Sequence, residues 1–204
     1  MLKNTFQKLS AKYVSNLQLT EKLWKEIEHN YSGPARYYHN LTHLENMFSE
    51  LSQVQTKIKN WDTILFALFY HDIIYKSTSN DNEEKSAELA EARLMQIGYV
   101  QKSIEKCKQI ILATKAHIES ADPDINYFTD TDLCILGQSW ENYSAYAKNV
   151  RKEYSIYPDF IYKPGRKKIL NHFLNMERIF KTEFFVAKFE KKAKENLTRE
   201  LGLL

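Results

Sequence analysis

Apolar residues recur along most of this chain three and four positions apart, which places them on one face of an α-helix. Residues 41–58 show the pattern clearly, and residues 62–75 are apolar at nearly every position. The second stretch therefore predicts a central helix that is buried on all sides. No segment alternates convincingly in the two-residue period of a strand, so we expect an all-α bundle of about nine helices.

Capping and turn residues suggest where these helices begin and end. Residues 2–17 predict a first helix, and Thr20 is expected to cap a second that ends near Tyr31. Asn80 and Glu83 resemble a capping box, and Gly98 is expected to close the helix that follows. Further helices are predicted over about 101–117, from 129–131, and over 140–157, 167–180 and 182–201, with breaks at 32–34, Pro158 and Pro164-Gly165.

The composition fits one globular domain. The chain has 204 residues with five glycines and four prolines. We expect a single domain over 1–204, with residues 1–19 as a candidate N-terminal appendage and 158–204 as a helical pair packed on the core. The N-terminus lacks the apolar core of a signal peptide, and no apolar run approaches the roughly 20 residues of a membrane span. The two cysteines form no disulfide framework, so a cytoplasmic protein without a membrane partner is predicted.

The charge is small but uneven. The formal net charge is +3, yet the segment from Arg151 to the end has 13 Lys/Arg against 7 Asp/Glu. Such a segment could meet RNA, a membrane surface or an acidic partner, but a solvated helix face is the more common explanation. We therefore do not expect a nucleic-acid partner.

The chemistry of the chain is concentrated in three short segments: Tyr38-His39-Asn40-Leu41-Thr42-His43, His71-Asp72 and Asp130-Thr131-Asp132. His39 and His43 are four residues apart and would share one face of a helix. The carboxylate of Asp72 interrupts an apolar run, which is costly unless a cation or another partner pairs with it. Imidazole and carboxylate together suit a borderline divalent metal. The pattern therefore predicts a metal site and a hydrolase.

Several candidate residues, in these segments and elsewhere, also have a structural explanation. Asp72 could pair with a buried arginine, and Asp132 and Glu83 could be capping partners of Thr129 and Asn80. His117 could complement the dipole at a helix end. The aromatic residues near the motifs could stack a nucleobase or belong to the core; they are Tyr37, Tyr38, Phe69, Tyr70 and Tyr75.

The ordered series of motifs resembles the HD superfamily of metal-dependent phosphohydrolases, and in particular a bacterial group of predicted HD phosphohydrolases. The segment from Tyr38 to His43 is also similar to the signature of cyclic-nucleotide phosphodiesterases. The resemblance covers about residues 20–201. Its landmarks are Arg36-x-Tyr38-His39-Asn40-x-x-His43, His71-Asp72-x-x-Tyr75, Asn82-Glu83-x-x-Ser86, Thr114-x-x-His117, Asp130-x-Asp132-Leu133, Arg151-x-Glu153-Tyr154, Gly165-Arg166 and 196–200.

The resemblance implies an HD-type helical bundle and one divalent metal ion. The sequence does not show whether this ion is Mn, Mg, Fe, Co, Ni or Zn. The implied ligands are His43, His71, Asp72 and Asp132, and the further candidates are His117 and Asp130. His39 would be the general acid that protonates the leaving oxygen.

Three further residues are candidates for substrate or water. Arg36 and Arg166 could hold phosphate oxygens because a planar guanidinium matches them in a bidentate fashion, although Arg166 could instead be an ion-pair partner. Glu83 could orient or deprotonate the attacking water.

The function expected from these residues is metal-dependent hydrolysis of a phosphate ester of a nucleotide or a related small molecule. The alternative is a catalytically silent HD module that binds a nucleotide or protein partner around a structural metal. The sequence leaves the substrate and the oligomeric state open.

Overall fold

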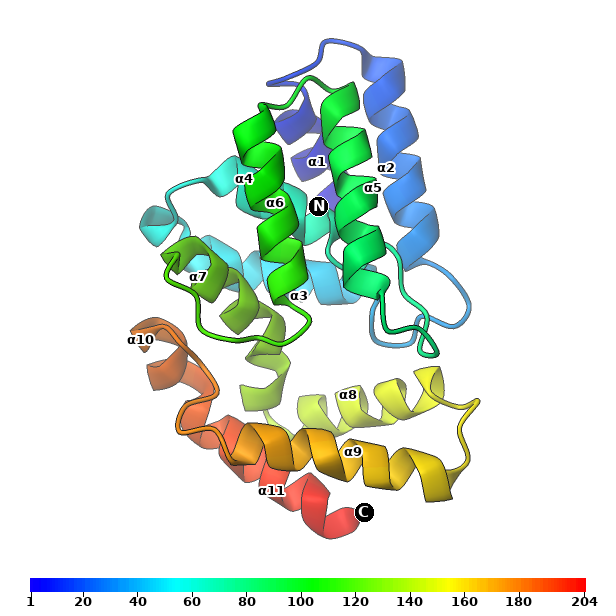
Figure 1. Ribbon diagram of the computed structural model, residues 1–204, viewed down its shortest axis with the longest axis vertical. Helices are drawn as coiled ribbons and strands as arrows, with labels where there is room; N and C mark the ends of the chain where they lie inside the picture. The colour runs from blue at the N-terminus through cyan, green and yellow to red at the C-terminus, as the bar shows by residue number, and fades with distance from the viewer. The chain divides into compact units, whose positions relative to one another are not determined.

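The computed structural model describes all residues from 1 to 204, and it is helical without any strand (Figure 1). Ten α-helices have nine residues or more, which confirms the predicted all-α fold and comes close to the predicted number. The α-helices are α1 (Leu2–Ser10), α2 (Leu17–Tyr31), α3 (Leu41–Gln53), α4 (Trp61–Tyr70), α5 (Asn82–Gln96), α6 (Gln101–Ala113), α7 (Pro123–Asp132), α8 (Trp140–Glu153), α9 (Asp159–Leu174), α10 (Glu183–Phe185) and α11 (Lys191–Leu203). None of them combines the length and the apolar character that crossing a membrane requires.

The chain divides into two compact units, Met1–Thr129 and Asp130–Leu204. The core of the first unit is built around α4, in which every residue from Thr63 to Tyr70 is buried. Helices α1, α3, α5 and α6 all pack against α4, and α5 and α6 lie side by side as a pair (Figure 1). Burial on all sides agrees with the uninterrupted apolar run in the sequence.

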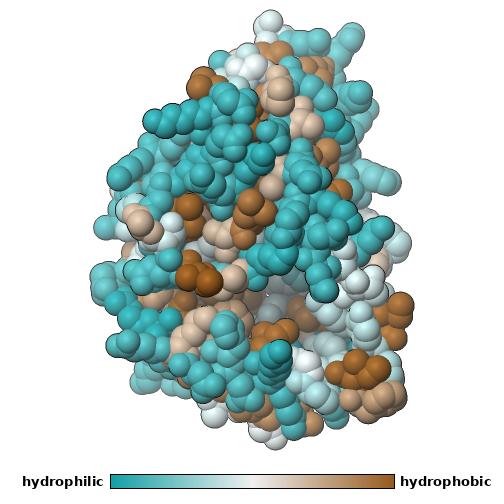
Figure 2. Space-filling model, viewed as in Figure 1, coloured by the Kyte–Doolittle hydropathy of each residue, from teal (hydrophilic) through white to brown (hydrophobic).

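Helix α1 is part of this core. Its Leu2, Phe6 and Leu9 are buried, and the Phe6 ring meets the edge of Phe69 with 5.1 Å between centroids. Each such buried side chain contributes roughly 1.5–3 kcal/mol by leaving water. On the outside, the face of the molecule in Figure 2 is mostly hydrophilic, with apolar side chains in separate patches.

Several helix ends differ from the sequence prediction. Helix α1 ends at Ser10, and α2 begins at Leu17 because Asn16, a preferred N-cap, accepts a hydrogen bond from Leu19 N at 3.0 Å. The predicted cap, Thr20, is instead a buried residue inside α2. The predicted helix over 41–58 ends at Gln53 and is followed by a short 3₁₀ turn over 55–57, and the one over 140–157 ends at Glu153.

In the second unit, α11 packs against α8 and α9. The guanidinium of Arg166 is buried and forms two 2.8 Å hydrogen bonds with the carboxylate of Glu200. The predicted break at Pro164-Gly165 is wrong, because α9 begins at Asp159 and continues through both residues. The buried Arg166 and Leu170 anchor this helix from within, and tertiary packing outweighs the breaking tendency of proline.

Helix α9 ends at Leu174, six residues before the predicted end at Phe180, and two carboxylates bind the backbone of the segment that follows. Asp130 accepts hydrogen bonds from Lys181 N and Thr182 N, at 2.9 and 2.8 Å. Glu190 accepts from the backbone N–H groups of Ile179 and Phe180 at 3.1 Å. Because these N–H groups bond side chains rather than preceding carbonyls, residues 179–182 do not continue the predicted helix over 167–180.

Candidate metal centre

The first histidine of the centre is placed by a helix cap. Asn40 is the N-cap of α3, and its Oδ1 accepts hydrogen bonds from Thr42 N at 2.9 Å and His43 N at 3.3 Å. His43 therefore lies in the first turn of α3 and is buried, whereas His39 precedes the helix. The expectation that both histidines share one helical face is wrong, because Asn40 starts the helix between them.

The His71-Asp72 pair follows the C-terminal end of α4. The helix was expected to run to Tyr75, but it ends at Tyr70, and His71 is its C-cap residue. On a continuous helix two adjacent side chains point about 100° apart. Beyond the helix end they converge instead, and His71 Nε2 lies 3.2 Å from Asp72 Oδ2.

Asp132 is the last residue of α7. This helix begins at Pro123, where the carboxylate of Asp124 accepts hydrogen bonds from the backbone N–H groups of Lys59 and Asn60, at 2.9 and 3.0 Å. The prediction that a short helix begins near residues 129–131 is wrong, so Asp132 is not a capping partner of Thr129. The Thr129 hydroxyl donates instead to Ile125 O at 3.0 Å.

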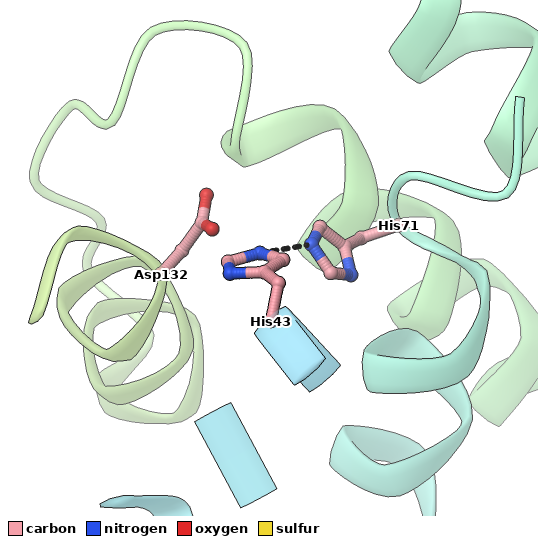
Figure 3. Close-up of side chains that lie close together, drawn as sticks. All are labelled: His43, His71 and Asp132. Carbon is pink, nitrogen blue, oxygen red and sulfur yellow. Dashed lines mark hydrogen bonds between the residues drawn. The ribbon is translucent and has the colours of Figure 1, made fainter. Parts of the chain in front are cut away.

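His43, His71 and Asp132 come together as a possible metal site (Figure 3). One ligand atom from each lies within 4.8 Å of the others, and His43 Nε2 is 3.3 Å from His71 Nε2. The two histidines are only 4% and 1% exposed. Asp72 is not a member of this group, but its Oδ2 lies 4.0 Å from His43 Nε2.

These distances fit the coordination sphere of one divalent ion. Ligand atoms about 2.1 Å from an ion lie about 3.0–3.4 Å apart in adjacent positions and about 4.2 Å apart in opposite ones. The 3.3 Å between His43 and His71 and the 3.2 Å between His71 and Asp72 match adjacent positions. The 4.0 Å between His43 and Asp72 is closer to opposite positions. Two neutral imidazoles and two carboxylates would balance the charge of a dication.

The tautomer of His71 follows from its other ring nitrogen, Nδ1, which lies 3.0 Å from Leu68 O. A carbonyl oxygen can only accept, so Nδ1 carries a proton and Nε2 is the ring nitrogen that faces the centre. The edge-on ring of Phe128, 5.7 Å away between centroids, further limits rotation of the imidazole. His71 is thus oriented as a metal ligand.

Arg36 connects the two loops that carry these residues. Its guanidinium donates to the carbonyl oxygens of His39 at 3.0 Å, Asp72 at 2.7 Å and Ile73 at 2.9 Å. It also lies over the ring of Tyr75, 5.3 Å from the centroid. These contacts favour a role in fixing the loops over the predicted contact with phosphate oxygens.

His39 lies beside the metal centre and is half-buried. Its ring stacks on Tyr75 with 4.1 Å between centroids and an angle of 28°, and its centroid is 6.0 Å from that of His43. This position is compatible with the predicted general acid.

Glu83 and His117 are not members of the group formed by His43, His71 and Asp132. Glu83 is half-buried in the first turn of α5, which begins at Asn82, so the capping box at Asn80 is wrong. His117 follows the end of α6 with a φ of 52°, and its N–H donates to Ala113 O. The helix predicted over 101–117 thus ends earlier, at Ala113.

Asp130 and Arg166 are engaged within the second unit. The Asp130 carboxylate is buried and accepts from the backbone and the hydroxyl of Thr182, whereas Asp132 belongs to the cluster with the histidines. The Arg166 guanidinium is paired with Glu200, which agrees with its expected alternative as an ion-pair partner.

Sequence reasoning missed the supporting residues. Asn40 carried a usable signal, since asparagine directly before a helical pattern is a preferred cap. The hydroxyl of Tyr31 accepts a hydrogen bond from Asp72 N at 3.1 Å. No sequence signal indicated this contact, because the two residues lie far apart in the chain.

Comparison of the chain with protein-family models, curated proteins and solved structures gave no match. The resemblance to the HD superfamily therefore stays a prediction. The function is argued from the geometry of the centre.

Proposed function

We propose that this protein is a metal-dependent phosphohydrolase. The observation that supports the proposal best is the 3.3 Å approach of His43 Nε2 and His71 Nε2, with the carboxylates of Asp72 and Asp132 beside them. A bound divalent ion would lower the pKa of a coordinated water and polarise a phosphoryl oxygen.

The side chains of the centre would have two roles, metal binding and proton donation. His43, His71, Asp72 and Asp132 would hold the ion, with His71 oriented by Leu68 O. His39, half-buried and steadied by Tyr75, would donate a proton to the leaving oxygen, a role that suits imidazole near neutral pH.

The substrate class we propose is a phosphate ester of a nucleotide or a related small molecule. Tyr37 is 45% exposed and Tyr38 is half-buried in the same segment as His39. Aromatic rings at this place offer a stacking surface for a base. Since the Arg36 guanidinium already donates its hydrogen bonds to backbone carbonyl oxygens, the metal ion would have to neutralise the negative charge of the phosphate.

The first test is the metal content of the purified full-length chain. We expect close to one equivalent of a divalent metal, and its loss in the double variant H71A/D72A. H29A is the matched control, because His29 is an exposed histidine outside the centre. Circular dichroism of each variant separates loss of metal from loss of fold.

The second test is turnover of a phosphate monoester, p-nitrophenyl phosphate, and a diester, bis(p-nitrophenyl) phosphate, followed by a nucleotide screen with Mn, Mg, Co and Zn. Hydrolysis that disappears in H71A/D72A and persists in H29A supports the proposal, and the preferred ester defines the reaction type. Metal binding without turnover of any ester would support a silent binding module instead. Absence of metal under every loading condition would overturn the proposal.

A further inference from the structure

A second candidate site lies wholly within the second unit. A cavity of about 600 Å³ is formed among α8, α9 and the end of α11. Small-molecule sites typically have about 300–1,000 Å³. Its lining residues are Ala145, Ala147, Lys148, Asn149, Arg151, Lys152, Asp159, Tyr162, Lys163, Glu200 and Leu204.

The acidic groups of the wall are already neutralised by arginines. Asp159 accepts hydrogen bonds from Arg151 Nη2 at 2.8 Å and Nε at 3.2 Å. Glu200 is held by Arg166, also through two hydrogen bonds. Neither carboxylate is therefore available to balance a further positive charge in the cavity.

Two cationic groups of the wall have no such partner. Lys148 on α8 and Lys163 on α9 line the cavity without a salt bridge or hydrogen bond to another residue. Their ammonium groups leave the wall with an excess of positive charge. An anionic group of a ligand would complement this charge and could accept hydrogen bonds from both lysines.

The remaining wall is suited to an apolar body. Ala145 and Ala147 contribute small apolar side chains, and Tyr162 contributes a half-buried ring. Arg151 lies over this ring at 4.6 Å and donates to the carbonyl oxygens of Tyr154 and Tyr157. These contacts fix the connection between α8 and α9.

From these features we infer that the cavity formed by α8, α9 and α11 binds a small organic anion with an apolar or aromatic body. Lys148 and Lys163 hold the anionic group, and the alanines and Tyr162 contact the body. The site shares no residue with the candidate metal centre.

Fluorescence titration of the full-length protein with 1-anilinonaphthalene-8-sulfonate tests this inference, because that probe joins an aromatic body to one anionic group. We expect saturable binding of one equivalent, weakened about tenfold in the variant K148Q/K163Q. The control K167Q/K168Q removes the same charge from two exposed lysines of α9 outside the cavity and should bind like the wild type. The neutral analogue N-phenyl-1-naphthylamine should bind more weakly and equally to all three proteins.

Amide chemical shifts give the location independently of any variant. Shifts caused by the sulfonate probe should concentrate in residues 145–152 and 159–163. Non-saturable binding, equal losses in both lysine variants, or shifts spread over other helices would each overturn the inference. The result is separate from the proposed hydrolase activity, because neither the metal nor a phosphate ester is needed for the assay.

Discussion

The side chain of Arg36 and the backbone of Asp72 are joined by a 2.7 Å hydrogen bond from the guanidinium Nη1 to the carbonyl oxygen. The same nitrogen donates to His39 O, so one side chain determines the spacing of the segments that carry the predicted acid and a predicted ligand. Groups that support metal ligands in this way commonly change metal affinity when they are removed.

We therefore expect R36Q to weaken binding of Mn²⁺ or Zn²⁺ by about 10- to 100-fold, measured by isothermal titration calorimetry. The guanidinium fork is needed for the three carbonyls, so R36K should restore little of the affinity. R178Q, which removes a more exposed arginine of the second unit, is the control. Unchanged affinity in R36Q would show that Arg36 does not support the centre.

Asn40 should contribute to stability through the cap of α3. N40A removes the acceptor for Thr42 N and His43 N and should lower the free energy of unfolding by about 1 kcal/mol. N40D keeps the acceptor but loses the Nδ2 donor to Tyr37 O at 3.1 Å, so its loss of stability should be smaller than that of N40A. Urea denaturation with a chelator present measures the protein itself, since bound metal would add its own stabilisation. Equal loss in N40D and N40A would contradict the capping role.

The buried pair of Arg166 and Glu200 predicts a dependence of stability on pH. Burial alone would raise the pKa of Glu200, but its hydrogen bonds with Arg166 and the positive charge outweigh this and lower the pKa below its ordinary value of 4.5. Because the folded pKa is lowered, the stabilisation is complete above the ordinary value and is lost as the pH falls through the folded one.

The variant E200Q removes this titration and leaves Arg166 without its charged partner. At pH 7 we expect a loss of about 3–5 kcal/mol in the free energy of unfolding. The difference from the wild type should shrink as the pH is lowered from 5 to 3. Chemical denaturation of both proteins at each pH gives this difference, and a difference that stays constant over the range would contradict the explanation.

Two glycines of the second unit should respond to alanine in opposite directions. A Cβ at Gly137 would lie 2.8 Å from the carbonyl oxygen of Phe189, so G137A should destabilise the protein by about 1–3 kcal/mol. A Cβ at Gly165 in α9 would meet no atom within 4 Å, so G165A should stabilise the helix by about 0.5–1 kcal/mol. Thermal unfolding of the two variants checks the signs, and a neutral G137A would mean that the backbone at Phe189, just before α11, moves away freely.

Helical periodicity was sufficient to predict the all-α fold and the burial of α4, because both depend on the local spacing of apolar residues. The end of α4 was not predictable, since Ile73 and Ile74 continue the apolar run beyond Tyr70. The start of α7 was mistaken although Pro123 stands at its first position, a place that proline favours.

The candidate site was predictable as a set of residue types but not as an arrangement. Histidines and aspartates in this order along the chain indicate a candidate metal site, because imidazole and carboxylate suit a divalent ion. The partners of Arg36 are backbone carbonyls, which no side-chain pattern in the sequence encodes.

At the end of α4, the Tyr31 hydroxyl accepts the backbone N–H that would continue the helix, and the Leu68 carbonyl accepts from an imidazole. If α4 continued for one more turn, Leu68 O would receive the N–H of Asp72, four residues on. That N–H donates to Tyr31 instead, and Leu68 O remains for His71 Nδ1. The helix therefore ends where the backbone N–H of Asp72 turns to a tyrosine forty-one residues upstream, and the two predicted ligands leave the helical path at that point.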